Sequence, residues 1–128
     1  MNTQTILAVA IGGAAGSVGR YMAMSVVGQW LGTGFPWGTL LVNVLGSFVM
    51  GVLVEMSALA WSPSPEMRAL LVVGVLGGFT TFSTFSLDVG YLVERQQTAV
   101  AAIYAVASVA LSVGALFLGL ALIRQVVR

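Results

Sequence analysis

Ten consecutive residues, Gly77 to Ser86, carry the densest group of side chains and backbone in this chain that could bind an ion. They lie inside an apolar segment, about residues 67–93, that is long enough to cross a bilayer as a helix and has Thr80 at its middle. Adjacent glycines weaken a helix, and clustered hydroxyls compete for its backbone hydrogen bonds; the hydroxyls here are Thr80, Thr81, Ser83, Thr84 and Ser86. Backbone groups that lose their helical hydrogen bonds at membrane depth must line a polar cavity or be buried in protein. The pattern predicts a third helix broken at the midplane, with either an ion or substrate site or a small-residue packing face there.

Phe82 and Phe85 lie three residues apart, which places both rings on one side of a helix. An aromatic ring has a positive edge and a negative face. Ring edges, together with amide and hydroxyl donors, can surround a small anion without a fixed positive charge that would trap it. A pair of core rings is the simpler interpretation, and the residue types alone favour it.

Other polar side chains interrupt the apolar segments. Asn43 is a lone amide in the second segment, where it could bond a neighbouring helix or serve as a ligand. Tyr104, Ser108 and Ser112 recur at i, i+4 and i+8, which favours a polar track along the fourth helix over pure packing. Asp88 follows Phe85 by about one turn, and a carboxylate at that depth needs water, an arginine or a pore.

The first apolar segment contains an arginine. Arg20 lies ~21 Å along this segment at ~1.5 Å per residue, short of the ~30 Å hydrocarbon core. It could act at a functional site or extend to the interface beside Tyr21. Gly12, Gly16 and Gly19 form one glycine face suited to close helix contact.

The composition is that of an integral membrane protein. Of the 128 residues, 7% are charged and 59% hydrophobic, and the mean hydropathy is +1.02, whereas soluble domains carry roughly 25% charged residues. The chain has no cysteine and no histidine, which excludes disulfides, Cys/His metal sites and a histidine base. We expect that this protein is not an enzyme. The net charge of +1 gives no basic surface for nucleic acid.

We therefore predict an all-α fold, a single domain of residues 1–128 with four transmembrane helices at about residues 5–27, 37–56, 65–93 and 98–124. Gln29 to Trp37 forms the first connection. Ser64 is expected to cap the third helix, with Pro65 at its first position and Glu66 in its first turn.

The charges at the two ends of such a bundle are nearly balanced. With four spans, one end carries Arg68, Arg124 and Arg128, and the other carries Arg20 and Arg95. Three arginines against two give the positive-inside rule almost no bias to act on. The chain could insert in both orientations and pair as an antiparallel, dual-topology homodimer, with two copies of the break meeting on its axis.

Three stretches resemble the CrcB/Fluc family of fluoride channels. They are GGAAGSVGRY at residues 12–21, GTLLVNVLG at residues 38–46 and GGFTTFSTFS at residues 77–86. Their order, the length of the chain and the four spans match the family as well. The resemblance implies an antiparallel dimer with two pores, in the cytoplasmic (inner) membrane of a bacterium, that exports fluoride passively.

The resemblance also implies a set of functional residues. The fluoride pore would contain Asn43, Phe82, Ser83, Thr84, Phe85, Tyr104, Ser108 and Ser112. Phe82 and Phe85 would contact fluoride by their edges, and Asn43 would donate its amide. Backbone carbonyls of Gly77 and Thr80 from both subunits would hold a structural sodium ion, and Arg20 would give the vestibule positive character. Asp88 departs from the family, which often has glutamate there.

Two other classes of membrane protein fit parts of this pattern. A small dual-topology multidrug exporter has the same size but needs a carboxylate in its first helix, and this chain has none there. A scaffold without transport activity would account for the glycine faces. It would not account for a midplane break, a hydroxyl stripe and paired rings in one chain.

Overall fold

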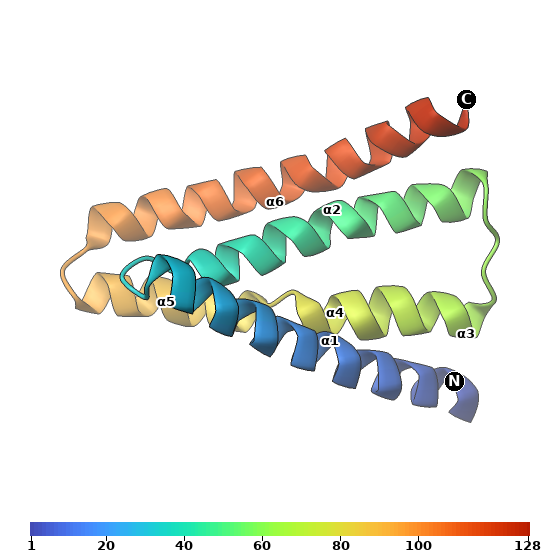
Figure 1. Ribbon diagram of the computed structural model, residues 1–128, viewed down its shortest axis with the longest axis horizontal. Coiled ribbons are helices and arrows are strands. Elements are labelled where there is room, and N and C mark those ends of the chain that lie inside the picture. The colour runs from blue at the N-terminus through green and yellow to red at the C-terminus, as the bar shows by residue number, and fades with distance from the viewer.

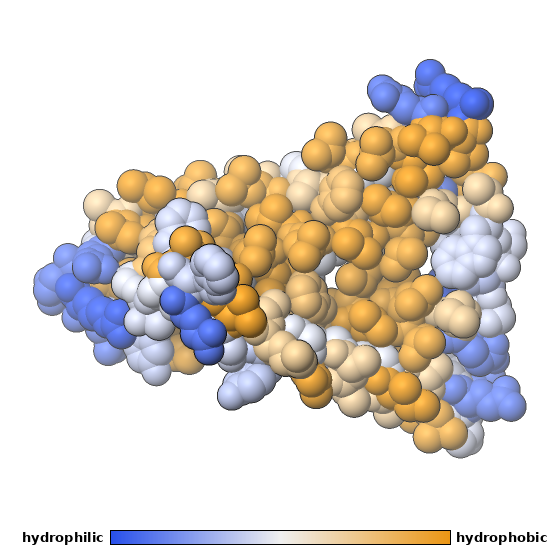
Figure 2. Space-filling view, viewed as in Figure 1, coloured by the Kyte–Doolittle hydropathy of each residue, from blue (hydrophilic) through white to orange (hydrophobic).

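The computed structural model describes residues 1–128 and is entirely helical. Its elements are α1 (Thr3–Leu31), α2 (Trp37–Leu59), α3 (Pro65–Arg68), the π-helical η1 (Ala69–Leu76), α4 (Gly77–Phe79), α5 (Phe82–Glu94) and α6 (Thr98–Val127). Four segments, α1, α2, Pro65–Glu94 and α6, are long and apolar enough to cross a membrane. Figure 2 shows apolar side chains over the middle of the molecule and hydrophilic ones mostly at its ends, as expected of a multi-pass membrane protein.

The four spans form two closely packed pairs. α1 packs along η1, and α2 packs along α6. Both termini and the α2–α3 connection lie at one end, and the other two connections lie at the opposite end (Figure 1). This is the arrangement expected from four spans.

The helix ends follow the capping residues. The side chain of Ser64 accepts a hydrogen bond from the backbone N–H of Met67 at 3.1 Å, with Pro65 at the first helical position, which confirms the predicted start of the third span. The first helix continues through Gly28 to Leu31, four residues beyond the predicted end. At φ +78° Gly32 adopts a conformation that favours glycine, and it ends the helix there. The first connection is therefore shorter than predicted.

Glycines permit the close approach within each pair, as the glycine face of the first segment predicted. Gly12 and Gly16 are buried, and a Cβ at Gly16 would run into the backbone carbonyl of Val75 in η1. Gly51 and Gly119 play the same part between α2 and α6. Gly13, one residue from Gly12, has open space around it.

The substitution Gly16→Ala is expected to destabilise the protein. The new methyl group meets backbone, which cannot rotate away, and overpacking of this kind costs about 1–3 kcal/mol. Gly13→Ala is the matched control and should be neutral or gain up to about 1 kcal/mol of helix propensity. Thermal unfolding in detergent measures both, and equal midpoints for the two variants would contradict the packing described here.

Candidate functional site

Two residues with extended backbone interrupt the third span. α4 ends at Phe79 and α5 begins at Phe82, and between them lie Thr80 (φ −86°, ψ 157°) and Thr81 (φ −152°, ψ 117°). The hydroxyl of Thr81 accepts a hydrogen bond from the N–H of Thr84 at 3.1 Å and so caps α5. The helical hydrogen bonds that would cross this segment are missing, so its backbone polar groups need other partners.

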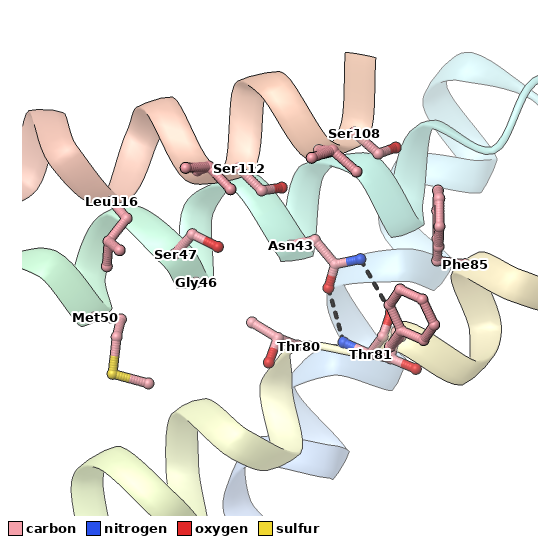
Figure 3. A pocket seen from close by; sticks show the side chains of 13 residues that line it. Asn43, Gly46, Ser47, Met50, Thr80, Thr81, Phe85, Ser108, Ser112 and Leu116 are labelled. Atoms are coloured by element: carbon pink, nitrogen blue, oxygen red, sulfur yellow. Dashed lines mark hydrogen bonds between the residues drawn. The ribbon is translucent and has the colours of Figure 1, made fainter. Parts of the chain in front are cut away.

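Side chains from α1 and α2 supply some of those partners. The amide of Asn43 donates from Nδ2 to the carbonyl of Thr81 at 3.0 Å and accepts at Oδ1 from the N–H of the same residue at 2.7 Å (Figure 3). Arg20 donates from Nε to the carbonyl of Gly78 at 3.0 Å. Asn43 therefore bonds a neighbouring span and still has one amide hydrogen free.

Three backbone carbonyls of this segment have no donor within the chain. The carbonyl oxygens of Gly77, Phe79 and Thr80 accept no hydrogen bond from backbone or side chain. Neutral carbonyl oxygens left without donors suit a weakly charged cation better than they suit hydrocarbon. These carbonyl oxygens are therefore chemically suited to be ligands of a sodium ion.

A groove of about 460 Å³ opens beside the extended segment. Its polar and aromatic lining comes from α2, α5 and α6 and from the segment itself: Asn43, Ser47, Thr80, Thr81, Phe82, Phe85, Ser108 and Ser112. The hydroxyl oxygens of Ser108 and Ser112 are buried and have no hydrogen-bond partner. No charged side chain lines the groove. It therefore offers neutral donors in an apolar setting.

A row of aromatic rings leads into this groove. The centroids of Phe82 and Phe85 lie 5.4 Å apart, and Phe85 lies 5.2 Å from Tyr104. Phe35, from the α1–α2 connection, meets Tyr104 at 5.4 Å with the two rings at 85°. Tyr104 is fully buried and donates its hydroxyl to Asp88 Oδ2 at 3.0 Å. Phe82 is 77% exposed, so it is not a core ring of this chain, contrary to what the residue types alone favoured.

The structure separates the predicted site residues into groups. The groove brings together Asn43, Phe82, Phe85, Ser108 and Ser112. Tyr104 lies beside Phe85 but does not line the groove, and Ser83 is exposed and near the Thr81 hydroxyl, at 3.3 Å. A second pocket contains Thr84 and Arg20 with Ser17, Tyr21, Met24 and Ser25. Gly77 is exposed in the single chain, next to the break.

Three contributors were not found from the sequence. Thr81 is both the cap of α5 and the backbone partner of Asn43. In the sequence it is one of five clustered hydroxyl residues, and nothing distinguishes it from the others. Gly46 is buried where a Cβ would overlap the methyl group of Thr80, so it leaves room for that side chain beside the break. Phe35 lies in a connection, and no periodicity indicated its contact with Tyr104.

Comparison with known proteins gives a consistent result. The profile of the family described as CrcB-like protein, Camphor Resistance (CrcB), matches residues 7–120. A protein of Rhodospirillum centenum named fluoride-specific ion channel FluC is 62% identical over 122 residues, 95% of this chain and 97% of its own length. Proteins of the same name from Nitrobacter winogradskyi and Rhizobium meliloti are each 54% identical, over 94% and 95% of this chain and 96% and 98% of their own lengths. From its first helix to its last, this chain belongs to the CrcB-like family.

Proposed function

We propose that this chain forms a fluoride-selective channel that lets fluoride leave the cell passively across the cytoplasmic (inner) membrane of a bacterium. The observation that carries the proposal is the groove, whose lining includes two aromatic rings, one amide and two serines with unpartnered hydroxyls, and no charged side chain. The relatives are named as fluoride-specific ion channels, not as enzymes or drug exporters, and this agrees with the chemistry of the lining.

The lining suits a small anion. A channel must replace the water around its ion with protein groups, yet bind the ion weakly enough to release it. The free amide hydrogen of Asn43, the hydroxyls of Ser108 and Ser112 and the ring edges of Phe82 and Phe85 can all turn partial positive charge toward an anion. None carries a full charge that would hold it. Tyr104, Ser83 and Thr84 lie outside the groove, and they would line the path by which the ion enters or leaves the pore.

The channel would be an antiparallel homodimer with two pores. The groove is open on the single chain and Phe82 is exposed beside it, so a second copy of this chain would complete the wall. The break at Thr80 and Thr81 would lie at the membrane midplane and meet its counterpart on the dimer axis. The ends carry few arginines, three at one end and Arg95 at the other, with Arg20 bonded at the break between them, and so small a bias is compatible with insertion in both orientations.

Fluoride release from liposomes containing the purified protein tests this function. A channel gives rapid fluoride flux driven by its gradient alone, without a proton gradient. A multidrug exporter would couple a cationic drug to protons, and a scaffold would move neither. Absence of fluoride flux from a purified, dimeric protein would refute the proposal.

The carbonyls of Gly77 and Thr80 would hold a structural sodium ion on the dimer axis. Their lack of hydrogen-bond donors supports this assignment. The ion would neutralise carbonyl dipoles that face one another across the axis and so stabilise the dimer.

Replacing sodium by a large organic cation is expected to lower both the thermal stability of the dimer and the fluoride flux, because four carbonyls would then face one another without a partner. The measurements are unfolding in detergent and flux from liposomes in matched buffers. Potassium at equal ionic strength is the control for screening. Identical stability and flux in all three buffers would argue against the ion.

Asp88→Asn is expected to retain measurable fluoride flux, at a reduced rate. Asparagine keeps an oxygen that can accept the hydrogen bond of Tyr104, and the carboxylate does not line the groove. Asp88→Ala removes the acceptor and leaves a buried hydroxyl unpaired, a loss of about 1–3 kcal/mol. Complete loss of flux in Asp88→Asn with an intact dimer would show that the negative charge takes part in moving the ion.

A further inference from the structure

Arg20 reaches the backbone at the break with one particular nitrogen. It lies in the middle of α1, and its Nε–H donates to the carbonyl of Gly78 at 3.0 Å. In a continuous helix that carbonyl would accept from the N–H of Phe82, which begins a new helix instead. The bond satisfies one of the carbonyls that the break leaves without a helical partner, and it places positive charge at the negative end of a helix.

The two terminal amino groups of the Arg20 guanidinium, unlike its Nε, have no partner within the chain. They make no hydrogen bond or ion pair within the chain, and Arg20 lines the second pocket with Ser17, Tyr21 and Thr84. The side chain thus has one nitrogen on the backbone of the third span and two without a partner in the chain, in a residue that lines the second pocket. A lysine could not do both, because it carries one nitrogen at its tip and none at the Nε position.

We infer that Arg20 is a positioning residue for the break, in addition to any role of its charge at the mouth of the pore. By holding the carbonyl of Gly78, it decides which carbonyls stay free, and the free ones include Gly77 and Thr80. Asn43, on α2, does the same for the carbonyl of Thr81. The consequence for sodium and fluoride rests on the proposed function, whereas the ordering of the break does not.

Two substitutions separate the donor from the charge. Arg20→Gln places an amide nitrogen on the same carbon that bears Nε in arginine, so it keeps a donor for Gly78 and loses the charge. Arg20→Lys keeps the charge and loses the donor at that position. The same pair of substitutions at Arg95 provides matched controls, because Arg95 is exposed and its guanidinium carbon lies 5.8 Å from the centroid of the Tyr91 ring.

Amide hydrogen exchange over residues 77–86 is the measurement that does not depend on transport. In Arg20→Lys the exchange is expected to quicken by roughly tenfold or more, the factor implied by loss of a hydrogen bond to a charged group. In Arg20→Gln it should stay closer to that of the unchanged protein, and the Arg95 variants should not alter it. Size-exclusion chromatography selects the dimeric fraction. If Arg20→Lys fails to fold, Arg20→Gln decides alone, because exchange about tenfold faster than in the unchanged protein would overturn the positioning role.

Flux adds a second and independent comparison. Arg20→Lys is expected to need more sodium for half-maximal fluoride flux, whereas Arg20→Gln should need more fluoride and an unchanged sodium concentration. Normal exchange in Arg20→Lys, or faster exchange in Arg20→Gln than in Arg20→Lys, would overturn the positioning role and leave Arg20 as a charge alone. Absence of fluoride flux in the unchanged protein would refute the proposed function, and the exchange result would still stand.

Discussion

Three lysines added to the connection between α5 and α6 are expected to fix one orientation of this chain and abolish fluoride flux. Lysine next to a span is retained on the cytoplasmic side, and three such charges outweigh the native difference, which is one arginine from the sequence count and two when Arg20, bonded at the break, is left out. All copies would then insert the same way, and no antiparallel partner would be present to close the groove. An accessibility tag at the C-terminus, probed from each side of the membrane, verifies the orientation.

The reciprocal variant provides both control and rescue. Three lysines in the connection between α2 and α3 should impose the opposite orientation and also abolish flux, although the added charge is the same. Expressed together, the two variants should assemble and conduct. Three serines at the same positions should change neither orientation nor flux. Full flux from either lysine variant alone, with its C-terminus on a single side, would rule out the antiparallel dimer.

Phe82→Ile and Phe85→Ile are expected to conduct far less fluoride while still forming stable dimers. Isoleucine keeps apolar bulk but has no positive ring edge to offer an anion. Loss of a contact of about 2–3 kcal/mol would change occupancy or crossing rate by roughly 30- to 150-fold. Phe82 is 77% exposed and Phe85 is only partly buried, so the fold should survive either substitution.

The same substitution elsewhere controls for a general effect of losing a ring. Phe117 lies on α6, is exposed and borders neither pocket, so Phe117→Ile should leave flux unchanged. Liposome release and size-exclusion profiles are compared for the three variants. Near-normal flux in both Phe82→Ile and Phe85→Ile would remove the main physical reason for assigning fluoride to this groove.

The spans could be predicted from the sequence because a bilayer imposes strict requirements. Long apolar runs, the Ser64 cap and the glycine face on α1 each have one simple structural meaning, and the structure confirms all three. The groove residues could be named only partly from spacing. Tyr104, Ser108 and Ser112 share one helix face, and only the two serines line the groove, because the ring of Tyr104 turns toward Asp88.

The remaining features depend on contacts between distant segments. η1 has the composition of any apolar helix, and nothing in its residues indicates π-helical hydrogen bonds. The bond from Arg20 to Gly78 joins residues 58 positions apart, and the bonds from Asn43 to Thr81 join residues 38 positions apart. A single sequence shows that these residues are polar and at similar depth, but not which atom meets which.

The double hydrogen bond between Asn43 and Thr81 has a consequence for ion discrimination. A free amide side chain is ambidentate: it can turn its oxygen to a cation or its nitrogen to an anion. Thr81 presents one donor and one acceptor, so reversing the amide of Asn43 would set N–H against N–H and oxygen against oxygen. The oxygen of Asn43 is thereby kept on the backbone, and the remaining N–H is the part of this amide left to meet an ion. In the proposed pore, a cation beside Asn43 would find a donor where it needs an acceptor, because this neutral side chain is unable to turn round.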